Sequence, residues 1–148
     1  MKTFLKILAA IVVLLVFGVV IFFIWFNSTY PNVGPAEDIY VEITPERIAR
    51  GDYLANNVAV CIDCHSDRDW RYYAGPIVPG TEGKGGLNFS EELPLPGIIY
   101  SQNITPAGLR GWTDGEIIRA ITSGVSKDGT VLFPIMPYHQ YNRMDRED

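Results

Sequence analysis

Three reactive side chains lie within five positions of one another: Cys61, Cys64 and His65, in the run VAVCIDCHSDRDW. They include both cysteines of the chain and one of its two histidines. Two thiols separated by two residues and followed directly by an imidazole are typical of c-type haem attachment, in which both thiols form thioethers to the porphyrin. The motif therefore predicts covalent haem c on Cys61 and Cys64, with His65 as the proximal iron ligand.

Two other kinds of site also use closely spaced cysteines. A disulfide across two residues closes a very small loop and adds little stability, and its redox-active forms follow a strand and precede a long helix. Here a helical pattern precedes the motif and a segment rich in proline and glycine follows it. A structural zinc site needs four ligands, and beside the thiols only His65 and His139 are available. A structural metal-binding module is therefore the weaker interpretation.

A second axial ligand to the iron is expected from the rest of the chain. Met1 lies before the apolar N-terminal run, and Met144 lies in the charged run NRMDRED. Met136 and His139 remain as candidates for the second axial ligand. Met136 lies between Pro134 and Pro137. Prolines fix their own φ and restrict the residue before them, so this loop is stiff enough to hold a weak thioether ligand. Met136 is therefore predicted to be the distal ligand, in preference to His139.

The compartment follows from an uncharged run of twenty residues, 7–26. As a helix it spans about 30 Å, the thickness of a bilayer core. Lys2 and Lys6 precede the run and the next charge is Glu37, so the positive-inside rule predicts a cytoplasmic segment 1–6 and a periplasmic remainder. A cleaved signal peptide is the alternative, but its apolar region is usually about 7–15 residues and a small-x-small site follows. We expect a retained single-pass anchor in the cell membrane.

The exported part is predicted to be a linker, 27–43, and one domain, 44–148. Pro31, Gly34 and Pro35 mark the linker. All 17 acidic residues but only 10 of the 12 basic ones follow the apolar run, so the exported part is strongly acidic. This charge argues against a nucleic-acid partner.

Helix signals bracket the cysteine motif. Thr44, Pro45 and Glu46 predict a helix that begins at 45 and ends near 58, just before Cys61. Gly51 in its middle costs about 1 kcal/mol relative to alanine, which suggests that another helix crosses closely there. The face of this helix carries Ile48, Leu54, Ala55 and Val58.

A second helix is predicted from Thr113 to Gly124. Thr113 and Glu116 have the spacing of a capping box, and Gly124 is a plausible C-terminal stop. Its apolar stripe is formed by Ile117, Ile118 and Ile121. The segment between the two helices is rich in glycine and proline and is predicted to be irregular loop.

The stretch ARGDYLANNVAVCIDCHS, followed by YSQNITPAGLRGWTDGEIIRAITSGVSKDGTVLFPIMPY, resembles class I-type mono-haem cytochrome c domains. Such domains occur in the cytochrome c subunits of membrane-bound alcohol, aldehyde and gluconate dehydrogenases. The resemblance covers residues 47–141 and implies a small all-α, haem-wrapping fold with long irregular loops. It implies haem c on Cys61 and Cys64, and iron held by His65 and Met136.

The resemblance also implies an electron carrier and not an enzyme. Such a carrier moves single electrons between a dehydrogenase or respiratory complex and a downstream acceptor. The dehydrogenase subunits usually carry several such domains, whereas this sequence has one motif. A haem-based gas or redox sensor is the alternative, but the six residues predicted on the cytoplasmic side are too few for an output domain.

The end of the sequence resembles the beginning of a helix. Asp145 is a good N-cap, and Glu147 and Asp148 are acids in a first turn. In the family that the chain resembles, a C-terminal amphipathic helix starts here and crosses the first helix at a glycine. The sequence thus leads us to expect a domain truncated before its C-terminal helix, with the face of Ile48, Ala55 and Val58 partly open to water; the alternative is a short form in which haem or a partner subunit covers that face.

Overall fold

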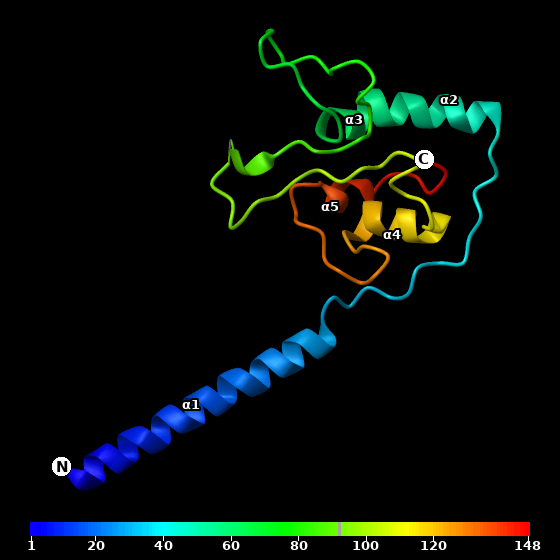
Figure 1. Cartoon of the computed structure of the whole chain (residues 1–148). Helices are drawn as coiled ribbons and strands as arrows, with labels where there is room; N and C mark the ends of the chain where they lie inside the picture. The colour runs from blue at the N-terminus through cyan, green and yellow to red at the C-terminus, as the bar shows by residue number, and fades with distance from the viewer. Residues whose placement is uncertain (92) are drawn as a thin grey trace. The chain divides into compact units, whose positions relative to one another are not determined.

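The computed structural model describes residues 1–91 and 93–148, which form two compact units, Met1–Pro35 and Ala36–Asp148. The first unit contains α1 (Lys2–Thr29), a 28-residue helix whose side chains are nearly all exposed (Figure 1). In the described part of the chain, α1 is the single helix long and apolar enough to cross a membrane. Its composition accounts for this, because no charged residue lies between Lys6 and Glu37.

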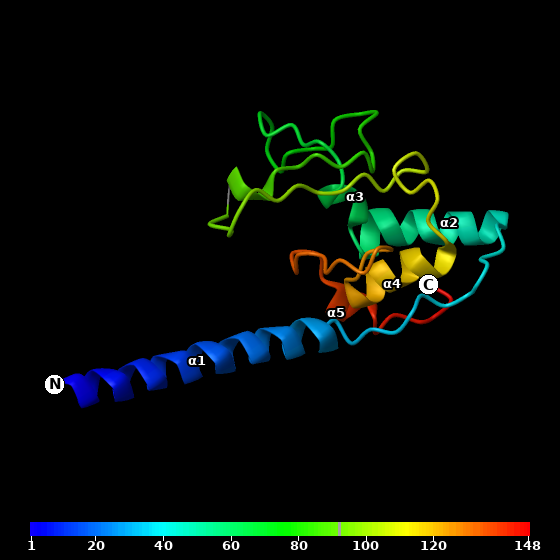
Figure 2. The same cartoon turned by 60° about the horizontal axis from the view of Figure 1, so that its bottom comes forward.

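The second unit is built from short helices joined by long irregular segments (Figures 1 and 2). In chain order its elements are α2 (Pro45–Tyr53), a π-turn (Leu54–Val58), α3 (Cys61–Cys64), a 3-10 turn (Phe89–Glu91), α4 (Asp114–Ser123) and α5 (Tyr138–Tyr141). Among the described residues no strand forms, and the irregular segments contribute isolated bridges alone. The predicted helical class with irregular loops is confirmed, and a cytochrome c-like fold is consistent with it.

The first predicted helix forms as α2 and continues through the π-turn to Val58. The side chain of Thr44 caps it, accepting a hydrogen bond from the Arg47 amide at 3.2 Å. Leu54 is buried, whereas Ile48 is 60 % exposed. No described atom lies within 4 Å of the Cβ position of Gly51, so the close crossing expected there is not found in this part of the chain.

The second predicted helix forms as α4 with the expected ends. Thr113 and Glu116 make a reciprocal capping box, and Gly124 ends the helix in the left-handed region at φ 67°. The predicted isoleucine stripe is not the buried face, since Ile118 and Ile121 are exposed and Gly115 and Ala120 are buried instead. The reason is tertiary packing: segments distant in sequence cover the small residues of α4 and cover the isoleucines only in part.

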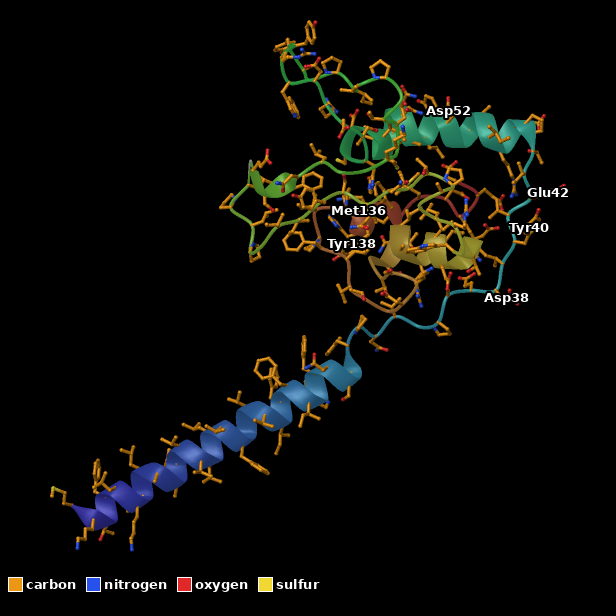
Figure 3. All side chains as sticks on the ribbon, in the orientation of Figure 1. Asp38, Tyr40, Glu42, Asp52, Met136 and Tyr138 are labelled. Atoms are coloured by element: carbon orange, nitrogen blue, oxygen red, sulfur yellow. The ribbon has the colours of Figure 1, made fainter. Side chains whose placement is uncertain are left out.

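One such segment is residues 36–43, which run along the first turn of α4. The backbone N–H of Val41 donates to a carboxylate oxygen of Asp114 at 2.7 Å. The carbonyl of Glu37 lies so close to Gly115 that no side chain would fit there. Arg146 forms an ion pair with the Glu37 carboxylate, and this hydrogen bond lowers the pKa of Glu37. Residues 36–43 therefore belong to the compact second unit, with Asp38, Tyr40 and Glu42 pointing outward (Figure 3).

The apolar core of the second unit is small. Among the described residues, the buried hydrophobic side chains are Leu54, Ala120 and Val125. Two hydroxyl side chains, those of Ser66 and Ser101, are buried as well. Both serines lie in the irregular segments around the cysteine motif, so polar contacts organise that region more than apolar packing does.

Candidate haem-binding site

The cysteine motif forms the short helix α3, and an unusual residue precedes it. Val60 adopts φ 49° and ψ 35°, in the left-handed region that β-branched residues rarely enter. This residue separates the π-turn from α3, so the motif begins in a new direction after Val58. Cys61 is half-buried and Cys64 is exposed, and both are free thiols.

Burial and nearby charge act on these two thiols. Burial raises the pKa of the Cys61 thiol. Burial also raises the pKa of the Cys64 thiol; Asp63 raises it further, and Arg68 partly offsets this. Both side chains are therefore protonated near neutral pH, which slows their oxidation to a disulfide because the thiolate is the reactive form.

The ring of His65 is held by a backbone carbonyl. Its Nδ1 lies 2.6 Å from the carbonyl oxygen of Gln102, which can only accept a hydrogen bond. In the neutral imidazole, Nδ1 then carries the proton and Nε2 keeps the lone pair that a metal ion would use. The arrangement sets both the tautomer and the orientation of the imidazole as a metal ligand requires.

Gln102 is held in place by backbone pairing between two irregular segments, 83–89 and 99–104. Gly86 donates its N–H to Ser101 at 3.0 Å, and Ser101 donates to Leu87 at 3.0 Å. Gly85 donates to the carbonyl of His65 at 2.8 Å, which ties the same segments to the motif itself. A chain segment about 37 residues beyond His65 thus supplies its hydrogen-bond partner.

Ser66 adds a buried connection next to His65. Its side chain is fully buried, donates to the Ile62 carbonyl at 2.6 Å and accepts from the Gly83 amide at 3.1 Å. Ile104 donates to the Gly83 carbonyl at 2.8 Å. The buried Ser66 hydroxyl therefore links α3 to the segment 83–89 through hydrogen bonds.

The backbone of Gly85 lies too close to that of Gln102 to leave room for a side chain, and this yields a testable prediction. A Cβ at Gly85 would lie 2.5 Å from the carbonyl carbon and oxygen of Gln102, and φ is +71°. Gly85→Ala is expected to displace Gln102 and to lower the free energy of unfolding by about 2–4 kcal/mol, because contact and backbone strain add. Chemical denaturation of the purified chain measures this.

Gly80 provides the matched control for that substitution. It has a similar φ of +84°, and no described atom lies within 4 Å of its Cβ position. Gly80→Ala is expected to cost about 1–2 kcal/mol, which is the backbone strain alone. Equal losses for the two variants would show that Gly85 has no special role next to Gln102.

Met136 lies in the loop that leads into α5 and is half-buried (Figure 3). Its carbonyl accepts a hydrogen bond from the Tyr138 amide at 2.8 Å, and the Tyr138 ring packs against Gly124. At the other end of α5, the Tyr141 hydroxyl donates to the Ala59 carbonyl at 2.7 Å. The methionine loop is thereby tied to the chain two residues before Cys61.

Tyr141 also lies close to both sulfurs. Burial raises the pKa of its phenol, and the charges of Cys61 and Cys64, when ionised, raise it further. His139, the alternative ligand, is exposed on α5, with its ring edge-on to Tyr138. Of the two candidates for the distal position, Met136 is therefore the less exposed.

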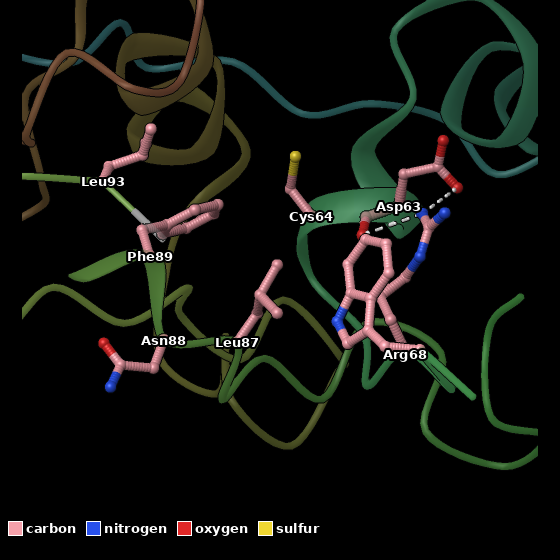
Figure 4. Close-up of a pocket in the computed structure, with 8 residues that line it drawn as sticks. Asp63, Cys64, Arg68, Leu87, Asn88, Phe89 and Leu93 are labelled. Atoms are coloured by element: carbon pink, nitrogen blue, oxygen red, sulfur yellow. Dashed lines mark hydrogen bonds and ion pairs between the residues drawn. The ribbon is translucent and has the colours of Figure 1, made fainter. Parts of the chain in front are cut away.

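A pocket of about 220 Å³ opens beside Cys64, whose sulfur points toward it (Figure 4). Leu87, Phe89, Leu93 and Trp70 supply apolar walls. Asp63 and Arg68 form the charged wall, and their side chains are paired at 3.1 Å.

These features fit a haem. Two free thiols, an imidazole with an available Nε2 and a half-buried thioether are the kinds of donor that a c-type site uses. The pocket beside Cys64 is mostly apolar, as a porphyrin edge requires. The small apolar core also fits, because a flat apolar group would supply contacts that a domain of this size ordinarily makes between side chains. In the described residues, no cluster of three or more histidine, cysteine or acidic side chains could hold a bare metal ion.

Comparison with known proteins gives a consistent result. No protein-family model matches the chain. It is 37 % identical over 125 residues to the fructose dehydrogenase cytochrome subunit of Gluconobacter japonicus, covering 82 % of this chain and 23 % of that protein. It is 35 % identical over 104 residues to the cytochrome c subunit of the quinone alcohol dehydrogenase of Komagataeibacter europaeus, covering 68 % and 19 %.

A third relative has the same type of name. It is the gluconate 2-dehydrogenase cytochrome c subunit of Pantoea cypripedii, 35 % identical over 107 residues, with 68 % of this chain and 20 % of that protein covered. The chain spans about a fifth of the length of these relatives. Homologues at about 35 % identity are thus the cytochrome subunits of dehydrogenases, not their catalytic subunits, which supports a cytochrome c-like domain here.

Sequence reasoning missed Gln102, Gly85, Ser66 and Tyr141. A backbone carbonyl acts irrespective of its side chain, so Gln102 carries no residue-type signal. Glycines are frequent in the segment 75–97, and nothing local separates Gly85 from the others. Ser66 follows His65 directly, and this adjacency was the one available hint.

Proposed function

We propose that the chain is a membrane-anchored, mono-haem c-type cytochrome that carries single electrons from a dehydrogenase or respiratory complex to a downstream acceptor. The observation that carries the proposal is the hydrogen bond from His65 Nδ1 to the Gln102 carbonyl, next to two free thiols. It prepares one imidazole nitrogen for iron at a motif whose spacing suits covalent haem.

The residues have separate roles in this proposal. Cys61 and Cys64 hold the haem covalently, His65 binds iron on the proximal side, and Met136 binds it on the distal side. The haem supplies reversible one-electron chemistry. A thioether ligand favours ferrous iron, so Met136 sets a high potential, and the stiff proline-bracketed loop keeps that weak ligand in place.

The anchor and the charge suggest where the carrier works. Helix α1 would hold the haem domain on the periplasmic face of the cell membrane, which concentrates it near membrane-bound redox partners. The names of the relatives favour a dehydrogenase as electron donor. Because the exported part is acidic, a basic docking surface on the partner is expected.

Binding of carbon monoxide, followed by visible spectroscopy, distinguishes an electron carrier from a haem-based sensor. With both axial positions filled by His65 and Met136, the ferrous protein is expected to leave its visible spectrum unchanged under carbon monoxide and to titrate as a one-electron couple. The full chain, produced in cells with haem c maturation, is the material for this test. Rapid carbon monoxide binding by the native, folded protein would favour the sensor instead.

A further inference from the structure

The pocket beside Cys64 contains a permanent charge pair that the proposed function does not use. Among the described residues that line it, Arg68 and Asp63 are charged, and their side chains are paired at 3.1 Å (Figure 4). The remaining walls are apolar apart from Asn88 and Cys64. The Asp63 side chain is 48 % exposed, and an ion pair that is partly open to water adds little stability, so the pair is weak evidence for a purely stabilising role.

The guanidinium of Arg68 is held from several sides. Its side chain retains 17 % of its exposure. One nitrogen donates to the Ala74 carbonyl at 2.7 Å, and the group lies 5.4 Å from the Trp70 ring centre. Its Nε is buried and has no hydrogen-bond partner in the described part of the chain. The backbone of Arg68 bridges to Ile77, and the contacts with Ala74, Asp63 and Trp70 hold the guanidinium itself.

A fixed charge at this position acts on a redox group bound through Cys64. Reduction adds one electron and no proton, so the ferric haem carries one more positive charge than the ferrous haem. A nearby cation therefore disfavours the ferric state, and a nearby anion favours it, most strongly where water screens little. Arginine does not lose its proton in proteins, so its effect is independent of pH.

We propose that Arg68 and Asp63 tune the haem potential as an opposed pair: Arg68 favours the ferrous state and Asp63 favours the ferric state. Asp63 also positions the guanidinium, as do Ala74 and Trp70. This inference rests on the proposed function, because it requires haem at Cys64.

The test is a redox equilibration of the full, haem-loaded chain with a mediator dye of known potential. Arg68→Gln is expected to lower the ferrous-to-ferric ratio about 3- to 10-fold, and Asp63→Asn to raise it by a smaller factor, because water screens the more exposed Asp63. Arg68→Lys keeps the charge and is expected to stay within about twofold of the native ratio. Arg71→Gln is the matched control, since Arg71 is exposed, pairs with Asp69 and does not line the pocket.

Unfolding of the same variants separates tuning from structure. Neither lysine nor glutamine reproduces the planar set of donors of a guanidinium, so Arg68→Lys and Arg68→Gln are both expected to unfold more easily. Only Arg68→Gln removes the charge, so only this variant is expected to shift the ferrous-to-ferric ratio. Equal ratios for Arg68→Gln and Arg71→Gln, or a lower ratio for Asp63→Asn, would overturn the inference. If Arg68→Gln does not fold, the direction in which Asp63→Asn shifts the ferrous-to-ferric ratio tests the inference. A native chain without covalent haem would instead overturn the proposed function itself.

Discussion

Replacing Cys61 and Cys64 together by serine is expected to abolish covalent haem completely. A hydroxyl does not form the thioether that a thiol makes with a porphyrin vinyl group, so no bond would survive denaturation. The native chain is expected to give a haem-stained band on a denaturing gel and to keep its colour after acid–acetone extraction. The double variant, made in the same maturation-competent cells, is expected to give neither.

The single variants sharpen this prediction. Cys61→Ser and Cys64→Ser each leave one thiol, and each is expected to retain at most one thioether, visible as a shifted absorption band and weaker staining. Cys61 is half-buried and Cys64 exposed, so both sites are expected to accept the slightly smaller serine with little loss of packing. A native protein that loses its colour in acid–acetone, or a double variant that keeps it, would contradict covalent attachment at this motif.

Met136→Ala is expected to have the second-largest effect. Loss of the thioether removes the iron–sulfur charge-transfer band in the far red and opens the distal position to carbon monoxide. The reduction potential is expected to fall by about 0.1–0.3 V, within the range of roughly 0.8 V that axial ligands span. Visible spectroscopy and potentiometric titration of the full chain measure both changes.

Two control substitutions test whether Met136 is the ligand. His139→Ala removes the other candidate, which is exposed on α5, and is expected to leave the charge-transfer band and the potential unchanged. Met144→Ala removes a methionine outside the proline-bracketed loop and is expected to be equally silent. Loss of the band in Met144→Ala with Met136→Ala unchanged, or a native protein without the band whose potential changes in His139→Ala, would identify a different distal ligand.

Local sequence was sufficient for the ends of the two main helices. The caps at Thr44 and Thr113 and the stop at Gly124 form as predicted, because each depends on hydrogen bonds within a few residues along the chain. The spacing of Cys61, Cys64 and His65 is local in the same sense, so the chemistry of the motif can be read without a fold. The relatives agree with that interpretation at the level of a cytochrome c-like domain.

Burial was not predictable in the same way. The periodicity of α4 correctly indicated a helix, but its buried positions are Gly115 and Ala120 and not the isoleucines Ile118 and Ile121. Periodicity shows which residues share a face, whereas the segments that pack against the helix determine which face is covered. Residues 36–43 pack on Gly115, and no local pattern specifies that contact.

The sequence by itself determined the two helices and the long apolar segment and predicts the attachment chemistry, because each depends on neighbours along the chain. Only the tertiary structure brought the Gln102 carbonyl to His65, the Ala59 carbonyl to Tyr141 and the Asp114 carboxylate to the Val41 amide. Two of these contacts end on backbone carbonyls distant in sequence, 37 and 82 residues away, which every residue type supplies alike. Their positions follow from the path of the irregular segments, and that path is decided by pairing and packing across the whole domain.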